Sequence, residues 1–251
     1  MRRFISRSMI AAVAASALGA WPTSARADFG VNLIANPGAE SGTLVATVGG
    51  FSTYSTPGWT NLLGNFEAEL YSEGVAPNIN PASPGPADRG RLLFYGGVAA
   101  LTIATQSITL ATTDLAAIDA GRAGYNLSGY LGGFANQDDN TILSAAFRSG
   151  SGALLASSSV GPVLAADRNQ ISGLLFRSAS GAVPVGTRSV DILLTITRVS
   201  GSFNNGAADN LNFSLINPNA VPEPAAGALL VAGGLGLLAV RRRRGRDEAR
   251  A

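Results

Sequence analysis

Val190-Asp191-Ile192-Leu193-Leu194-Thr195-Ile196-Thr197 decides the fold, because this stretch is rich in the β-branched and apolar residues that are typical of a β-strand. Residues 102–110, 141–147 and 174–177 have a similar composition, and residues 210–215 alternate cleanly between apolar and polar side chains. Alternation is expected of a strand with one buried face, because successive side chains point to opposite faces. The sequence therefore predicts several short strands.

Turn-forming residues separate these stretches. Examples are Ser149-Gly150-Ser151-Gly152 and Asn204-Asn205-Gly206. Many short strands with turn signals at modest spacing predict an all-β chain that folds as an antiparallel β-sandwich or barrel. Residues 115–123 have a weak helical pattern, and we expect only a short turn there.

Residues 1–27 have the pattern of a secretory signal peptide. Arg2, Arg3 and Arg7 make the start basic, and residues 9–20 are almost wholly apolar. Ala25-Arg26-Ala27 then places small residues at the two positions that signal peptidase reads. We therefore expect export of the chain and cleavage after Ala27.

Residues 217–251 have the pattern of a membrane-held tail. Pro222, Glu223 and Pro224 precede the uncharged segment 225–240, which is followed by four arginines, Arg241, Arg242, Arg243 and Arg244. As a helix, the uncharged segment is about 24 Å long, slightly short of the roughly 30 Å hydrocarbon core of a bilayer. Its glycines weaken the helix further, and the arginines are expected to stay cytoplasmic. The alternative is an ordinary single-pass anchor.

This tail resembles the PEP-CTERM sorting signal of Gram-negative bacteria, in which Pro-Glu-Pro precedes one hydrophobic helix and an arginine cluster. The resemblance implies a linker with the sorting motif at 217–224, a transmembrane helix at 225–240 and a basic cytoplasmic tail at 241–251. It also implies an exosortase in the inner membrane as a processing partner. The body is then expected at the cell surface or in the extracellular matrix, after an intermediate held in the inner membrane.

The composition of the body, residues 28–216, excludes several functions. Eight arginines and thirteen acidic residues give it a net charge of about −5, which disfavours nucleic-acid binding. The sequence contains no cysteine, histidine or lysine. Thiol chemistry, histidine-based triads, the usual zinc sites and Schiff-base catalysis are therefore excluded. An enzyme built from this chain would depend on paired carboxylates, and no such pair stands out in the sequence.

Two segments at the ends of the body resemble the opening and closing parts of galactose-binding-like jelly-roll domains. They are Asn36-Pro37-Gly38-Ala39-Glu40, followed by Pro57-Gly58-Trp59, and Ala208-Asp209-Asn210-Leu211. The resemblance implies one jelly-roll sandwich. In carbohydrate-binding members, an acid in the first turn and an aspartate before the last strand share a calcium ion. This implies Glu40 and Asp209 as ligands of a structural Ca²⁺, whereas the alternative is that both residues only cap turns.

The run Phe66-Glu67-Ala68-Glu69-Leu70-Tyr71 alternates, and it is expected to place Glu67, Glu69 and Tyr71 on one face of a strand. This face is our candidate for ligand binding, and an ordinary solvated strand face is the alternative. Other aromatic candidates for a sugar contact are Tyr54, Trp59, Tyr95, Tyr125 and Tyr130, of which Trp59 is expected in the core. Asp138-Asp139-Asn140 is expected to form an acidic hairpin turn.

Taken together, these patterns predict an exported, non-catalytic β-sandwich that binds polysaccharide. The first alternative is a purely structural surface or matrix protein without a ligand. The second is a glycan hydrolase that works with carboxylates, for which the sequence provides no positive sign.

The sorting motif generates a direct prediction. Replacing Glu223 is expected to leave the full-length chain in the inner membrane, because the processing enzyme would no longer recognise Pro-Glu-Pro. Fractionation of the envelope followed by immunoblotting measures this. Unchanged processing of the Glu223→Ala chain would contradict the prediction.

Overall fold

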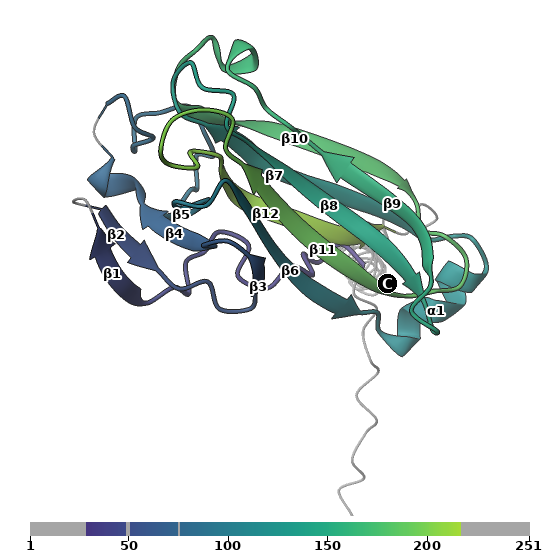
Figure 1. Cartoon of the computed structure of the whole chain (residues 1–251). Helices are drawn as coiled ribbons and strands as arrows, with labels where there is room; N and C mark the ends of the chain where they lie inside the picture. The colour runs from purple at the N-terminus through teal and green to yellow at the C-terminus, as the bar shows by residue number, and fades with distance from the viewer. Residues whose placement is uncertain (1–28, 49–50, 75, 217–251) are drawn as a thin grey trace, which may run out of the picture.

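The computed structural model describes residues 29–48, 51–74 and 76–216, which form two antiparallel sheets packed face to face (Figure 1). In spatial order, the larger sheet contains β1 (Leu44–Val48), β2 (Phe51–Tyr54), β4 (Glu67–Leu70), β5 (Leu92–Tyr95), β12 (Ala207–Ile216), β7 (Gly124–Gly133) and β10 (Gly173–Ala182). The smaller sheet contains β3 (Thr60–Leu63), β6 (Leu101–Thr109), β11 (Thr187–Thr197), β8 (Asn140–Ser149) and β9 (Leu154–Val160). The prediction of an all-β antiparallel sandwich is confirmed.

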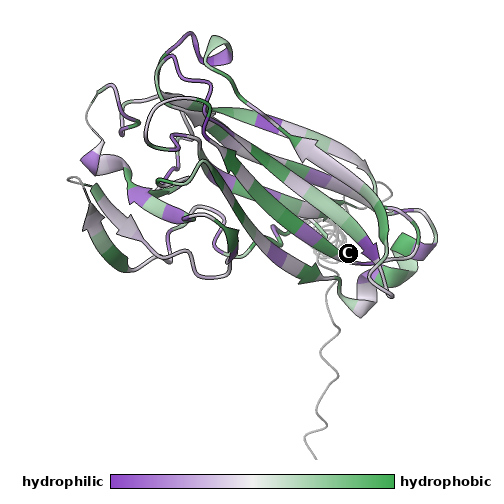
Figure 2. Ribbon diagram, in the orientation of Figure 1, coloured by the Kyte–Doolittle hydropathy of each residue, from purple (hydrophilic) through white to green (hydrophobic). Residues whose placement is uncertain are grey.

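The stretch 190–197 lies in β11, the central strand of the smaller sheet, between β6 and β8. Val190, Ile192 and Leu194 are completely buried, and the residues between them are only partly buried. Figure 2 shows the resulting alternation of hydrophobic and hydrophilic residues along the strands. Because full burial of a large apolar side chain contributes about 1.5–3 kcal/mol, this alternation holds the two sheets together.

Aromatic side chains join the sheets across the core. Phe147 of β8 and Phe213 of β12 are almost fully buried, and their ring centroids lie 6.1 Å apart. Trp59 packs on Phe66 and Phe94, with ring centroids 5.6 Å and 5.5 Å from theirs. Trp59 therefore lies against the core, as its sequence context predicted.

The expectation of a short turn at residues 115–123 is wrong. The chain forms the helix α1 (Thr112–Asp119) between β6 and β7. Ile118 of this helix is fully buried in the main core, and Asp114 lies in the first turn, where a negative charge is favourable. Burial of Ile118 thus stabilises a helix that the local sequence pattern only weakly favours.

The two ends of the described body lie side by side. Phe29 forms an isolated parallel bridge with Leu215 of β12, and the amide of Leu33 donates to the carbonyl of Phe213 at 2.8 Å. Further along, the amide of Leu211 donates to the carbonyl of Pro37 at 3.0 Å. The first segment of the body therefore follows the last strand, which brings the turn around Glu40 toward Asp209.

The predicted signal peptide (1–27), linker (217–224), transmembrane helix (225–240) and basic tail (241–251) lie outside the described residues. Within the described ranges, no helix has the length and apolar character needed to span a membrane.

Candidate functional site

The larger sheet carries a cavity of about 580 Å³ on the face that points away from the core. In β4 and β5, Ala68 and Phe94 belong to the buried core, whereas Glu67, Glu69 and Tyr95 line the cavity. This division follows from the period of two along a strand. The pairing of the two strands sets Glu67 directly opposite Tyr95. Alternation along two short strands therefore builds the floor of the cavity.

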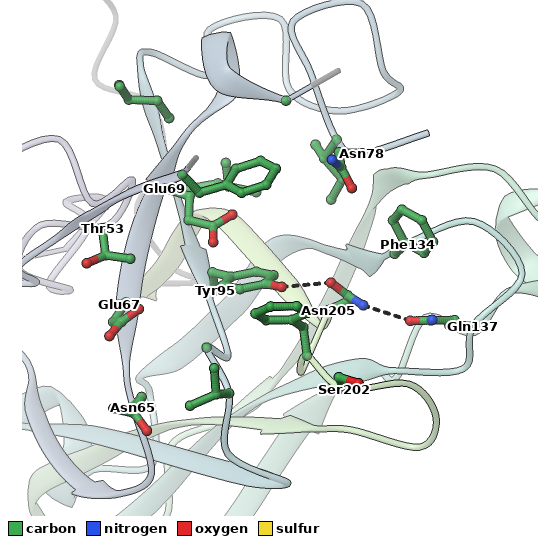
Figure 3. A pocket seen from close by; sticks show the side chains of 18 residues that line it. Thr53, Asn65, Glu67, Glu69, Asn78, Tyr95, Phe134, Gln137, Ser202 and Asn205 are labelled. Carbon is green, nitrogen blue, oxygen red and sulfur yellow. Dashed lines mark hydrogen bonds between the residues drawn. The ribbon is translucent and has the colours of Figure 1, made fainter. Parts of the chain in front are cut away.

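Among the residues that the structure describes, the lining combines aromatic, aliphatic and polar side chains and contains no arginine. Its aromatic members are Phe51, Tyr95, Phe134 and Phe203. Its polar members are Thr53, Asn65, Glu67, Glu69, Asn78, Gln137, Ser202 and Asn205 (Figure 3). Most of the walls come from loops that precede or follow strands, whereas the two glutamates come from the strand β4 itself.

Hydrogen bonds order one wall of the cavity. The hydroxyl of Tyr95 donates to Oδ1 of Asn205 at 2.7 Å, and Nδ2 of Asn205 donates to Oε1 of Gln137 at 2.8 Å (Figure 3). This chain joins β5 to the loops that follow β7 and precede β12. The three side chains therefore present their remaining polar atoms in a defined orientation.

Asp139 holds the loop that carries Ser202, Phe203 and Asn205. Its side chain is completely buried and accepts hydrogen bonds from the amides of Val199 (2.6 Å), Ser200 (3.0 Å) and Asn205 (2.9 Å). The expectation of an acidic hairpin turn at residues 138–140 is therefore wrong. The carboxylate of Asp139 turns inward because it satisfies three backbone donors from a segment some sixty residues away.

Both cavity glutamates have raised pKa values. Burial, reinforced by the charges of Glu67 and Glu73, raises the pKa of Glu69 to about 8, and burial also raises the pKa of Glu67. Within the described residues, neither side chain has a hydrogen-bond or ion-pair partner. Glu73, by contrast, accepts hydrogen bonds from the amide and hydroxyl of Ser52 at 2.6 and 2.8 Å. At neutral pH, Glu69 is therefore mostly a neutral acid that faces the cavity.

Tyr71 does not share the surface of Glu67 and Glu69, which corrects the sequence-based expectation. β4 ends at Leu70, and Tyr71 begins the 3-10 helix η1 (Tyr71–Glu73), where its side chain is buried. Its hydroxyl donates to Oδ2 of Asp209 at 2.7 Å, and the guanidinium of Arg89 lies 5.1 Å from its ring centroid. The period of two fails at this residue because the strand has already ended.

Glu40 and Asp209 are the predicted ligands of a calcium ion. Oε1 of Glu40 accepts hydrogen bonds from the amides of Arg91 and Leu92, both at 2.7 Å. Asp209 is completely buried, and besides the Tyr71 hydroxyl it accepts the amide of Asn210 at 2.7 Å. Burial raises the pKa of Asp209 to about 7, with the charge of Glu40 adding to the shift. The charge of Glu40 in the first turn therefore acts on Asp209 in the last strand.

The side-chain atoms near this pair are oxygens, the type of ligand atom that calcium binds. Oδ1 of Asp209 and Oδ1 of Asn210 lie 3.2 and 3.4 Å from the position that a β-carbon on Gly38 would occupy. A β-carbon on Gly90 would lie 2.5 Å from Oε1 of Glu40, so a larger residue there would displace the carboxylate. Calcium prefers such oxygen ligands. Because the described residues contain no group of three metal-ligating side chains, a calcium ion here would also need carbonyl or water ligands.

Sequence comparison identifies no family for this chain: no protein-family model and no curated protein matches it. Among solved structures, it is similar to a family 16 carbohydrate-binding module, with a TM-score of 0.46 and 14% identity over 72% of this chain and 99% of the module. A cyclase from Fischerella sp. TAU gives a TM-score of 0.48 and 14% identity over 73% of this chain and 96% of the cyclase.

The enzymatically active domain of bacteriophage CBA120 tailspike protein 4 gives a TM-score of 0.44 and 18% identity over 74% of this chain. The chain spans only 22% of that tailspike structure. With TM-scores below 0.5, these likenesses do not identify a function for this chain.

Glu69 generates a prediction about stability and pH. In the unfolded chain its pKa is near the ordinary value of 4.5, and in the folded protein it is about 8. Between these values, the folded protein keeps a proton that the unfolded chain has released, so wild-type stability falls as the pH rises. Glu69→Gln removes this dependence. Its free energy of unfolding, relative to wild type, is expected to rise by about 2–4 kcal/mol from pH 5 to pH 8.

Urea unfolding at a series of pH values measures this difference. Asp119→Asn serves as the control, because it removes one carboxylate from α1 rather than from the cavity. A difference between Glu69→Gln and wild type that does not change with pH would contradict the assignment of Glu69.

Proposed function

We propose that this protein is an exported, non-catalytic β-sandwich that binds polysaccharide through the cavity on its larger sheet. The observation that carries the proposal is the pairing of aromatic rings with polar groups in one open cavity of about 580 Å³. Cavities of this size are typical of small-molecule and oligosaccharide sites. Sugar rings present C–H faces that pack on aromatic rings, and their hydroxyls bond to amides and carboxyls.

Individual side chains support this function. Phe203 is 49% exposed although it is a large apolar residue, and it lines the cavity. Gln137 and Asn205 are oriented by hydrogen bonds that leave further donors and acceptors free. Glu67 and Glu69 have no partner within the described residues. A ligand with hydroxyl groups would therefore satisfy groups that the protein leaves unpaired.

The position of the cavity suits display on an envelope. Asn205 lines the cavity two residues before β12 begins, and the chain leaves the described body at Ile216, at the other end of this strand. Ten residues of strand span about 30 Å. If residues 225–240 hold the protein in the inner membrane before processing, the cavity lies near the end of β12 that is opposite to the point where the chain leaves the described body. The body would then present its cavity at the cell surface or in the matrix after sorting.

A structural Ca²⁺ between Glu40 and Asp209 is a second part of the proposal. The ion would neutralise a buried aspartate that forms no ion pair with any arginine of the described residues. It would also link the first turn to the last strand. Its role would be stability rather than chemistry.

A glycan hydrolase remains the second candidate function, and one observation favours it. Glu69 keeps a proton near neutral pH while Glu67 lies two residues away on the same strand face. Most glycosidases use a protonated carboxylic acid together with a second carboxylate that flanks the scissile bond. Release of products from a bound oligosaccharide, lost in Glu69→Gln, would establish this activity.

Binding of oligosaccharides tests the proposed function. The full chain, purified in mild detergent, is expected to bind some members of a panel of neutral, amino and acidic oligosaccharides without cleaving them. Phe203→Ala removes an exposed ring from the cavity and is expected to weaken binding about five- to ten-fold.

Phe176→Ala provides the matched control. Phe176 is 52% exposed and lies on β10, away from the cavity lining, so its loss should leave binding unchanged. If no oligosaccharide binds, the purely structural alternative is favoured.

Calcium removal tests the second part of the proposal. A thermal melt of the full chain is expected to shift upward by a few degrees with calcium relative to chelator, because a ligand that binds only the folded state stabilises it. Asp209→Asn should abolish the shift. Asp191→Asn should retain it, because Asp191 pairs with Arg148 at 2.8 Å on the smaller sheet. An identical melting temperature with and without calcium would remove the ion from the proposal.

A further inference from the structure

We infer that the cavity selects sugar units that carry a protonated amine, so that its glycan is an amino-sugar polymer with free ammonium groups. This inference rests on the proposed function and narrows it to one chemical class. It follows from the charge of the lining, from the absence of partners for Glu67 and Glu69 among the described residues, and from the aromatic rings beside them.

The described lining of the cavity contains two acidic side chains and no basic side chain that could neutralise them. Glu67 and Glu69 project from β4 into the cavity (Figure 3). Glu73 follows in η1 and is not part of the described lining. Glu73 is already held by Ser52, whereas the other two carboxyl groups accept no hydrogen bond from any described residue. A ligand cation would therefore meet two half-buried carboxyl groups that are free to pair with it.

The nearby arginines are engaged elsewhere. Arg89 donates to the carbonyls of Pro86, Asn80 and Ser83. Arg198 donates to the carbonyls of Val98 and Ser202, and the buried Arg168 donates to the carbonyls of Ala135, Gln137 and Ile171. These arginines form hydrogen bonds with the carbonyls of loops, and none of them lines the cavity. An anionic sugar would therefore find no cation among the described residues of the lining.

The aromatic rings of the lining are a second feature that favours a cationic ligand. Phe51, Tyr95, Phe134 and Phe203 line the same cavity as the two glutamates. The face of an aromatic ring attracts an ammonium group, and the attraction grows where water is excluded. A neutral sugar can stack on these rings, but it leaves both carboxyl groups without a charge partner. An amino sugar can stack on the rings and at the same time pair its ammonium group with the carboxyl groups.

The protonation of Glu69 supports this inference. The titratable groups that face Glu69 are Glu67 on the same strand, Glu73 in η1 and Tyr95 on β5, and none of them is a cation. An ammonium group placed beside Glu69 would lower its pKa toward the ordinary value, so that Glu69 releases its proton as the ligand binds. At mildly acidic pH, where the amine is charged before it binds, binding of an amino sugar should therefore release protons, and binding of a neutral sugar should not.

Calorimetry with matched hexasaccharides tests the inference on the full chain in mild detergent, at about pH 5.5, where the amines are charged and Glu69 still keeps its proton. The β-1,4-linked hexamer of glucosamine is compared with cellohexaose, which differs only by a hydroxyl in place of each amine. The glucosamine hexamer is expected to bind at least about ten-fold more tightly than cellohexaose. A galacturonate hexamer is expected not to bind.

Variants separate charge from shape. In the double variant Glu67→Gln, Glu69→Gln, the affinities for cellohexaose and for the glucosamine hexamer should lie within roughly two-fold of each other, because the substitutions remove the carboxyl groups and keep the shape of the side chains. Asp119→Asn, which removes a carboxylate remote from the cavity, should keep the preference. Titration in two buffers of different ionisation enthalpy should detect proton release with glucosamine for wild type and none for Glu69→Gln. A thermal melt of each variant confirms that it is folded.

The possible failures are distinguishable. If cellohexaose binds as tightly as the glucosamine hexamer, the inference is overturned and polysaccharide binding stands. If hexalysine binds as tightly as the glucosamine hexamer, the cavity recognises amines without a sugar, and the inference is again overturned. If no hexasaccharide binds, the proposed function fails and the inference fails with it.

Discussion

Burial of one face of each sheet is the constraint on which the rest of the structure depends. Ile192 and Leu194 of β11 and Phe213 of β12 are completely buried in the same core, so the inner face of each sheet presents apolar residues to the other sheet. The opposite face of β4 and β5 is then free of this requirement. That freedom is what allows Glu67, Glu69 and Tyr95 to line a cavity without disturbing the core.

Two buried carboxylates connect distant parts of the chain to this framework. Asp139 binds the amides of residues 199, 200 and 205, which holds the loop that forms one wall of the cavity. Asp209 accepts the hydroxyl of Tyr71 just beyond β4. Each carboxylate gains charge-assisted hydrogen bonds that offset part of its desolvation. One wall of the cavity is therefore fixed by polar contacts with Asp139, and the core beneath the cavity is fixed by apolar ones.

The cavity and the predicted calcium site differ in how their acids are satisfied. Glu40 accepts hydrogen bonds from two backbone amides, and Asp209 accepts them from a tyrosine hydroxyl and an amide. Both carboxylates therefore have hydrogen-bond partners in the folded protein. Glu67 and Glu69 accept nothing from the described residues. Leaving carboxyl groups half-buried without partners costs stability, and such a cost is typical of a site that binds a ligand. This contrast is why the amino-sugar inference rests on Glu67 and Glu69.

The sequence by itself determined the antiparallel sandwich, most of its long strands and the shared face of Glu67 and Glu69, because these depend on a period of two that is written locally along the chain. Tertiary structure alone decided that Tyr71 turns inward to Asp209, that Ile118 stabilises a helix and that Asp139 anchors a loop. Those outcomes depend on partners far away in the chain, such as Asp209, which lies 138 residues from Tyr71. No local pattern encodes them, because a buried polar group is oriented by whichever distant donor satisfies it.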